Sequence, residues 1–340
     1  MTRSMFRPKV AFALRSEELR GQLFPLDVLQ RLRSVADIVH EPVLTDFSSE
    51  TSLRVLSEVD ALITGWGVPI IDARVLDAAP QLQLIAHSAG TIKQHVDPAC
   101  WDRGITFTTA AQANAVPVAE FTLAFILLAG KQTFAAASQL RRLQERGQPT
   151  ILSASLGNLG STVGIIGASR IGRLVLERLK AFDHKILLAD PTVSESEASE
   201  LGATLVSLDD LMARADVVSL HAPLLPTTVG MIGAFQLGLM KDGATFINTA
   251  RGPLVDHEAL SGELVTGRIS AVLDVTEPEP LPAGDVLYGL DNVILTPHIA
   301  GSMGNELQRM GAAAVEEVLR LAEGRQYLHP VHYSELEAMA

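Results

Sequence analysis

The chain has 340 residues, of which 47% are hydrophobic, so it is long enough for two domains and too apolar for a disordered protein. Its formal net charge of −12, together with only three tyrosines and two tryptophans, argues against a nucleic-acid partner. Because the chain has one cysteine, lacks an uninterrupted apolar run of the ~18 residues that cross a membrane and shows no signal-peptide pattern, we expect a cytoplasmic protein without a membrane partner.

The first 109 residues alternate short apolar runs with segments of helical periodicity. Strands are expected at Lys9–Ala13, Ile38–His40, Ala61–Thr64, Leu82–His87 and Gly104–Thr109. Helices are expected at Pro25–Val35, at Glu50–Glu58 and in a segment that ends with Leu76–Pro80. Strands that alternate with helices predict a parallel sheet, so this region already makes one α/β domain.

A long apolar helix is expected over Val116–Gln132, leading away from this first domain. The segment that follows, to Leu159, is polar and amphipathic and has no strand pattern, so we expect a helical extension and an arm. Because the apolar helix is more hydrophobic than a lone surface helix requires, it predicts a homodimer through this region. The alternative is that the helix is buried within its own domain.

The stretch Val163–Gly172 predicts a strand that leads through a glycine-rich turn into an amphipathic helix over Ile171–Lys180. The free N–H groups and the positive end of such a helix suit the pyrophosphate of a dinucleotide. Cofactor contacts are therefore expected from Gly167, Ser169, Arg170, Ile171 and Gly172. The pattern is Gly-x-Gly-x-x-Gly with Ser169 at the second glycine, so this serine either donates to a phosphate or holds the pyrophosphate farther out.

The next predicted strand, Lys185–Asp190, ends in an acid 18 residues after Gly172. A carboxylate at this distance typically accepts hydrogen bonds from the ribose hydroxyls of the adenosine. Asp190 would also repel a 2′-phosphate, which predicts NAD rather than NADP. In the alternative interpretation Asp190 and Pro191 only end the strand and start a turn.

Alternation of strands and helices resumes after this point and predicts a second doubly wound parallel sheet. Its further strands are expected at Ala215–His221, Gly243–Asn248, Ile269–Asp274 and Asn292–Thr296. Ligands of such sheets bind outside the carboxyl ends of the strands. The polar residues expected at that edge are His221, Asn248, Arg251, Asp274 and His298.

Three blocks follow the glycine loop in order, Asn248–Gly252, Leu273–Pro282 and Thr296–Gly301. With the loop, they resemble the D-isomer-specific 2-hydroxyacid dehydrogenases, and the similarity extends over most of the chain, including Ala113–Glu120 and Asp216–Thr228. The resemblance implies an α/β fold of two doubly wound parallel-sheet domains, one Rossmann-like and one flavodoxin-like. It places a substrate-binding domain at 1–108 plus 299–340 and an inserted NAD-binding domain at 109–298.

Interconversion of a 2-hydroxy acid and a 2-oxo acid needs a cation for the carboxylate, an acid/base for the hydroxyl proton and a nicotinamide for the hydride. Arg251 suits the first role, because its planar guanidinium binds a carboxylate with charge-assisted hydrogen bonds. His298 suits the second, because histidine both accepts and donates a proton near neutral pH. The resemblance implies Glu279 as the carboxylate that stabilises and orients the imidazolium, with Glu277 as the alternative.

The resemblance also implies further cofactor contacts at the carboxyl ends of the strands. Asp274 is expected to bind the nicotinamide carboxamide. The other positions expected to line the cofactor are His221, Pro223, Thr228, Thr249 and Ala250. No group of histidine, cysteine and acidic residues has ligand spacing, so we expect no metal.

The least regular part of the resemblance is the substrate loop, where the family usually has Gly-x-Gly followed by an acid. An ungapped alignment places Ala89, Gly90 and Thr91 at the turn and Lys93 at the acid. A lysine there, with Trp66 beside the same cleft, would favour a substrate with a second anionic group. The alternative is that Lys93 is simply solvated.

The preferred hypothesis is therefore an NAD-dependent D-2-hydroxyacid dehydrogenase that reduces a small 2-oxo acid such as glyoxylate or hydroxypyruvate. One alternative is an NAD(H)-sensing protein of the same fold that binds protein partners, although the presence of Arg251, Glu279 and His298 argues against it. The other is a dehydrogenase for phosphite or formate. Formate enzymes of this family have an amide where Glu279 stands, which disfavours that branch.

Overall fold

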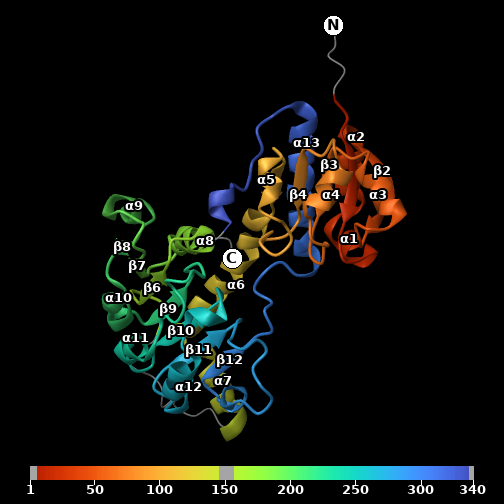
Figure 1. Ribbon diagram of the computed structural model, residues 1–340. Coiled ribbons are helices and arrows are strands. Elements are labelled where there is room, and N and C mark those ends of the chain that lie inside the picture. Colours follow the sequence, from red (N-terminus) through yellow and green to blue (C-terminus); the bar gives the residue numbers. More distant parts are fainter. Residues whose placement is uncertain (1–5, 145–156, 337–340) are drawn as a thin grey trace. The chain divides into compact units, whose positions relative to one another are not determined.

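The computed structural model describes residues 6–144 and 157–336. The chain divides into two compact units (Figure 1): unit 1 comprises Met1–Asn114 and Ser302–Ala340, and unit 2 comprises Ala115–Gly301. Unit 2 is thus inserted into unit 1. The boundaries expected at 108/109 and 298/299 lie a few residues before the observed ones, because Ala110 and Ala113 still pack into the core of unit 1.

Unit 1 is built on a five-stranded parallel sheet with the order β2-β1-β3-β4-β5. The strands are β1 (Lys9–Ala13), β2 (Asp37–Leu44), β3 (Ala61–Thr64), β4 (Leu84–His87) and β5 (Thr106–Thr109). All residues of β3 and β4 are buried, as expected for strands covered on both faces. Each strand predicted in this region is present.

Helices cover both faces of this sheet. They are α1 (Glu17–Leu23), α2 (Leu26–Val35), α3 (Glu50–Leu56), α4 (Ala73–Ala78), α5 (Ala99–Asp102) and α13 (Leu307–Glu323). Helix α1, which the sequence analysis did not identify, starts at the N-cap Ser16, whose side chain accepts from the Leu19 N–H. Helix α13 comes from the far end of the chain and packs against α1 and α2 (Figure 1). The C-terminal segment therefore completes the core of the N-terminal domain.

The last described residues also protect the edge of the sheet next to β5. The Val331 N–H donates to the Phe107 carbonyl oxygen at 2.8 Å, and Thr108 and Pro330 form an antiparallel bridge. Glu317 of α13 is buried and accepts from the backbone N–H groups of Leu328 and His329 at 3.0 and 2.9 Å. These contacts satisfy an edge that would otherwise offer unpaired backbone groups.

Unit 2 is built on a seven-stranded parallel sheet with the order β12-β11-β10-β9-β6-β7-β8. The strands are β6 (Thr162–Ile166), β7 (Lys185–Ala189), β8 (Thr204–Leu205), β9 (Val217–Leu220), β10 (Thr245–Asn248), β11 (Ser270–Leu273) and β12 (Val293–Leu295). The two-residue strand β8 was not predicted, because it is too short for a period to be visible. The others agree with the sequence analysis.

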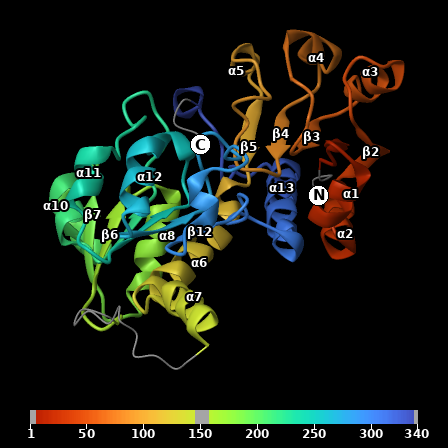
Figure 2. The ribbon, with the colours of Figure 1, turned by 90° about the horizontal axis from the view of Figure 1, so that it is seen from below.

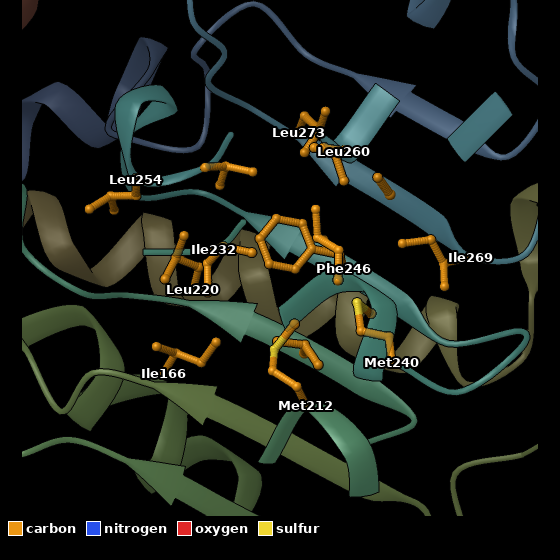
Figure 3. Close-up of a cluster of buried hydrophobic side chains, with 14 of the residues drawn as sticks. Ile166, Met212, Leu220, Ile232, Met240, Phe246, Leu254, Leu260, Ile269 and Leu273 are labelled. Atoms are coloured by element: carbon orange, nitrogen blue, oxygen red, sulfur yellow. The ribbon is translucent and has the colours of Figure 1, made fainter. Parts of the chain in front are cut away.

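The helices of unit 2 lie in two layers (Figure 2). One layer has α6 (Ala111–Ala129), α8 (Arg170–Leu179) and α9 (Glu195–Glu200), and the other has α10 (Leu208–Arg214), α11 (Ala234–Leu239) and α12 (His257–Val265). Under the second layer, the buried ring of Phe246 lies among Met212, Met240, Leu260 and Ile269 (Figure 3). Strand β6 continues to β7 on one side, and the chain then returns to β9 on the other. The carboxyl ends of β6 and β9 therefore mark the point where a doubly wound sheet binds ligands.

Helix α6 starts earlier than expected and is long and apolar enough to cross a membrane by length and composition, with a mean hydropathy of 1.5. It nevertheless carries Glu120 and buries Ala119 and Ile126 in the core of unit 2, as the core helix of a globular unit does. Helix α7 (Thr133–Leu143) follows it, and none of its residues, all of which are described, is buried. The rest of the expected arm, 145–156, lies outside the described residues.

Candidate active site

The turn between β6 and α8 has no room for side chains at two of its glycines. Gly167 has a φ of +93°, and a Cβ there would lie 2.7 Å from the backbone nitrogen of Ala222, in the loop after β9. A Cβ on Gly172 would overlap the Gly167 carbonyl oxygen. This close packing of strand, turn and helix leaves the N-terminus of α8 open to an anion, as a dinucleotide site requires.

Ser169, at the second glycine position, is the N-cap of α8. Its hydroxyl oxygen accepts from the Gly172 N–H at 3.4 Å. The hydroxyl hydrogen is not used by this bond, so it can donate to a phosphate oxygen. Arg170 and Ile171 follow in the first turn, and Arg170 is exposed and forms no ion pair within 6–144 and 157–336.

Asp190 follows β7, and its carboxylate accepts hydrogen bonds from the nucleotide loop and from the turn after β7. One carboxylate oxygen accepts from the Ala168 N–H at 2.7 Å, and the other accepts from the Thr192 N–H and hydroxyl at 2.8 and 2.6 Å. Burial raises the pKa of Asp190, but the bonds from Thr192 and Ala168 outweigh it and leave the pKa below its ordinary value. The carboxylate is therefore charged at neutral pH, and it both starts the turn and stands beside the nucleotide loop.

His298 follows β12 and forms a pair with Glu279 on the loop after β11. The Nδ1 of His298 lies 2.7 Å from Oε1 of Glu279, and the two side chains are 49% and 42% exposed. His298 adopts a φ of +55°, which is uncommon for a residue other than glycine. Glu279, not Glu277, makes this contact, so a half-exposed imidazole has a carboxylate as its hydrogen-bond partner.

Arg251 lies between β10 and the short helix η1 (Gly252–Leu254). One guanidinium nitrogen donates to the Ala250 carbonyl oxygen at 2.6 Å. Burial lowers the pKa of Arg251, and the nearby charge of Glu279 partly restores it, so the guanidinium stays protonated. No carboxylate among the described residues forms an ion pair with it, so this cation can bind a substrate anion.

The comparison with known proteins agrees with this geometry. Residues 123–300, which include the nucleotide loop, Asp190, Arg251, Glu279 and His298, match the sequence profile described as "D-isomer specific 2-hydroxyacid dehydrogenase, NAD binding domain". The chain belongs to this family. Its cofactor is NAD, and unit 2 carries the site for it.

Individual relatives agree with the family. The chain is 38% identical to a D-3-phosphoglycerate dehydrogenase of Mycobacterium bovis over 278 residues, which are 81% of this chain and 51% of that protein. It is 36% identical to a glyoxylate reductase of Thermofilum pendens, over 94% of this chain and 93% of that protein. The chain thus spans about half the length of the phosphoglycerate dehydrogenases it matches.

A solved structure supports the two-domain fold. The fold is similar to that of a phosphoglycerate oxidoreductase from Rhizobium etli, with a TM-score of 0.80 and 26% identity over 96% of this chain and 99% of that chain. The fold class expected from the sequence, two parallel α/β sheets, is therefore confirmed.

Several expected cofactor positions use their side chains internally. The hydroxyl of Thr249 lies 2.9 Å from that of Thr122 on α6, and the hydroxyl of Thr228 donates to the Pro223 carbonyl oxygen at 2.7 Å. His221 is 4% exposed, and burial lowers its pKa to about 3, so its ring is neutral. These positions, with Ala250, can offer backbone groups and surface to NAD rather than charged side chains.

Asp274 makes several hydrogen bonds within the protein. It is 2% exposed, and its carboxylate accepts from the Thr296 hydroxyl and from the N–H groups of Ile299 and Ala300, at 2.6, 2.8 and 2.9 Å. The sequence analysis assigned it to the nicotinamide carboxamide. Most of its hydrogen-bonding capacity is directed to the loop that carries His298.

The expected substrate loop lies in unit 1, at the carboxyl end of β4. Ala89 is buried, while a Cβ on Gly90 would contact only the Asn114 side chain at 4.0 Å. The Thr91 hydroxyl accepts from the N–H of Lys93, whose side chain is exposed. This loop is less tightly packed than the nucleotide loop of unit 2.

The carboxyl ends of β1 and β3 meet at the same edge of unit 1. Trp66, after β3, is half-buried, and its carbonyl oxygen accepts from the Arg15 N–H at 3.0 Å. The side chain of Arg15 is exposed and forms no ion pair with the part of the chain that the structure describes. The sequence analysis missed Arg15, although its place directly after a predicted strand could have indicated it.

Metal ligands were not expected, and the described residues contain no group of three histidines, cysteines or acids that could hold a metal ion.

Proposed function

We propose that the protein is an NAD-dependent D-2-hydroxyacid dehydrogenase that works as a reductase of small 2-oxo acids. The observation that carries the proposal is the 2.7 Å contact between His298 and Glu279 beside Arg251, which has no ion-pair partner among the described residues. When bound, NADH supplies the hydride. Arg251 binds the substrate carboxylate and polarises the carbonyl, His298 protonates the carbonyl oxygen, and Glu279 stabilises the imidazolium before transfer.

Turnover of a 2-oxo acid, followed by the loss of nicotinamide absorbance, tests this proposal. A set of glyoxylate, hydroxypyruvate, pyruvate, a branched 2-oxo acid, oxaloacetate and phosphonooxypyruvate covers the substrate class. If none is reduced, the NAD(H)-sensing alternative gains support. Oxidation of phosphite or formate with NAD would instead favour the anion dehydrogenases.

We propose that the substrate carries a second anionic group besides its carboxylate. Lys93 and Arg15, at the carboxyl edge of unit 1, would bind this group, with Trp66 beside them. Ala89, Gly90 and Thr91 would offer the backbone N–H groups of the substrate loop. Support comes from the exposure of both cations at one sheet edge and from relatives named for phosphoglycerate, which carries a phosphate besides its carboxylate.

The set of substrates, repeated with Lys93→Ala and Arg15→Ala, tests this specificity. We expect both variants to lose kcat/KM selectively on oxaloacetate and phosphonooxypyruvate. Arg54→Ala is the matched control, because Arg54 is an exposed arginine in the last turn of α3. Equal losses on charged and uncharged substrates would contradict the proposal.

We propose that the enzyme prefers NADH to NADPH, because the charged carboxylate of Asp190, directly after β7 and bonded to the nucleotide loop, would repel a 2′-phosphate. Asp190→Asn removes the charge and keeps an oxygen for the Ala168 N–H. We expect this variant to have a lower ratio of kcat/KM with NADH to kcat/KM with NADPH than the native protein. Equal use of NADPH by the native protein would show that the ribose assignment is wrong.

We propose a homodimer formed through the region after α6. Helix α7 is amphipathic, yet Leu140 and Leu143 are 57% and 49% exposed. An unburied apolar face of this kind is typical of an interface. Sedimentation at micromolar concentration tests this, and a monomer would contradict it.

We also propose a cytoplasmic location. The only cysteine, Cys100, is buried, and burial raises its pKa to about 11, so the thiol stays protonated and unreactive. Cell fractionation with an antibody would test the location.

A further inference from the structure

Two buried polar residues at neighbouring strand ends lie directly behind the catalytic side chains. We propose that Asn248 and Asp274 are positioning residues: Asn248 holds the turn that aims Arg251, and Asp274 holds the loop that aims His298. The inference rests on the function proposed above, because it concerns the same reaction. Neither residue needs to contact the substrate for this role.

Asn248 is the last residue of β10 and is 1% exposed. Its side-chain nitrogen donates to the Arg251 carbonyl oxygen and its side-chain oxygen accepts from the Ala250 N–H, both at 3.0 Å. The side chain thus closes the turn from both sides. Since the Arg251 guanidinium donates to the Ala250 carbonyl oxygen, the same turn determines where the cation points.

Asp274 directly follows β11 and organises the segment from Thr296 to Ala300. Its carboxylate accepts three hydrogen bonds from that segment, and its carbonyl oxygen accepts the His298 N–H at 3.0 Å. His298 has a left-handed backbone conformation that is unfavourable for a residue with a Cβ. Charge-assisted bonds on both sides of His298 can hold it there.

The two positioning residues, Asn248 and Asp274, are hydrogen-bonded to each other through their backbones. The Asp274 N–H donates to the Asn248 carbonyl oxygen at 3.0 Å, where β10 and β11 run side by side. In addition, a Cβ on Gly252 would overlap the Thr276 carbonyl, so the loops after these strands are in direct contact. The spacing between guanidinium and imidazole is therefore set by the sheet and not by the flexibility of surface loops.

Asp274 keeps some capacity for a second role. One carboxylate oxygen already accepts two bonds, whereas the other accepts only the Ala300 N–H and has one direction left. A contact with the nicotinamide carboxamide is therefore compatible with the positioning role.

Isosteric exchanges test the inference. Asn248→Asp replaces the donor to Arg251 with an acceptor, and Asp274→Asn turns an NH2 group toward backbone N–H groups. Thr296→Val removes only one bond and serves if Asp274→Asn does not fold. The matched control is Asn292→Asp: Asn292, before β12, donates to the Leu264 and Ile269 carbonyl oxygens in the same unit.

We expect Asn248→Asp to raise KM for the 2-oxo acid at least tenfold with a smaller change in kcat, because Arg251 binds the carboxylate. We expect Asp274→Asn to lower kcat at least tenfold, with Thr296→Val showing a smaller loss in the same direction. Asn292→Asp should retain kcat and KM. Losses no larger than those of Asn292→Asp, or parallel changes in kcat and KM for both variants, would overturn the inference.

Hydrogen–deuterium exchange provides a readout that does not depend on turnover. In Asp274→Asn the amide of Ile299 or Ala300 that faces the new NH2 group should exchange at least tenfold faster, while the amides of β6 keep the native rate. In Asn248→Asp the amide of Ala250 should respond in the same way. Unchanged exchange would overturn the positioning role, whereas failure of the native protein to reduce any 2-oxo acid would contradict the proposed function alone.

Discussion

Both units place histidines near the carboxyl ends of their parallel strands, but the histidines differ in what surrounds them. His87 ends β4 of unit 1 and is 1% exposed; His221 follows β9 of unit 2 and is 4% exposed. Burial, helped at His87 by the neighbouring His95, lowers the pKa of each to about 3. His298 is half-exposed and lies beside Glu279. A strand end brings a histidine to the ligand edge, and only exposure together with a carboxylate makes it suitable for proton transfer.

The loops at the two edges differ in the same way. In unit 2 the nucleotide loop is packed so closely on the loop after β9 that Gly167 cannot carry a side chain. In unit 1 the loop after β4 leaves space around Gly90. A side chain is therefore tolerated less well at Gly167 of the nucleotide loop than at Gly90 of the loop after β4.

The largest effect is expected for the acid/base itself. His298→Gln should lower kcat about 10²- to 10⁴-fold, the usual contribution of a positioned proton donor, and should leave NADH binding unchanged. His257→Gln is the matched control, since His257 also lies near a carboxylate, 3.3 Å from Asp285. Steady-state kinetics and NADH fluorescence titration measure both. Near-native turnover by His298→Gln would remove it from the mechanism.

The contrast between the loops is tested by two alanine substitutions. Gly167→Ala should cost about 2–5 kcal/mol of stability or local order, because it combines an unfavourable positive φ with a backbone clash, and it should abolish tight NADH binding. Gly90→Ala should change stability by less than about 1 kcal/mol. Urea unfolding and NADH titration are the measurements. Equal tolerance at both positions would mean that the two loops do not differ in packing.

The partner of His298 is tested by comparing two glutamates on one loop. Glu279→Gln should lower kcat about 10- to 100-fold, since it removes a charge-assisted hydrogen bond of about 1.5–3 kcal/mol. Glu277→Gln should stay within about twofold of native kcat. The reverse order of effects would assign the role to Glu277.

The smallest effect concerns the buried histidines and pH. Folding lowers the pKa of His87 and His221 from about 6.5 to about 3, so each stabilises the fold fully above pH 6.5 and progressively less as the pH falls toward 3. At pH 5.5 each should cost about 1.4 kcal/mol relative to pH 7.5. In urea unfolding, the free energy of unfolding of His87→Gln and of His221→Gln should therefore fall by about 1.4 kcal/mol less between pH 7.5 and pH 5.5 than that of the native protein. Retention of the native pH dependence by both variants would contradict this contribution.

Much of the architecture could be predicted because its causes are local. Strands such as Lys9–Ala13 and Lys185–Ala189 are apolar runs between helix-length segments, and their pattern is visible without tertiary contacts. Glycines at Gly167 and Gly172 indicated a tight turn because other residues do not fit there. The blocks around Arg251 and His298 indicated the chemistry, because the residue types needed for it stand at strand ends.

What only the tertiary structure decided are the bonds between segments far apart in the chain. The sequence did not show that Asp274 binds the loop of His298, because this depends on which N–H groups the fold brings near its carboxylate. Likewise, the sequence did not indicate that the segment around Pro330 returns to β5. Periodicity and residue type are written along the chain, whereas the pairing of buried donors and acceptors arises only when the two sheets are assembled.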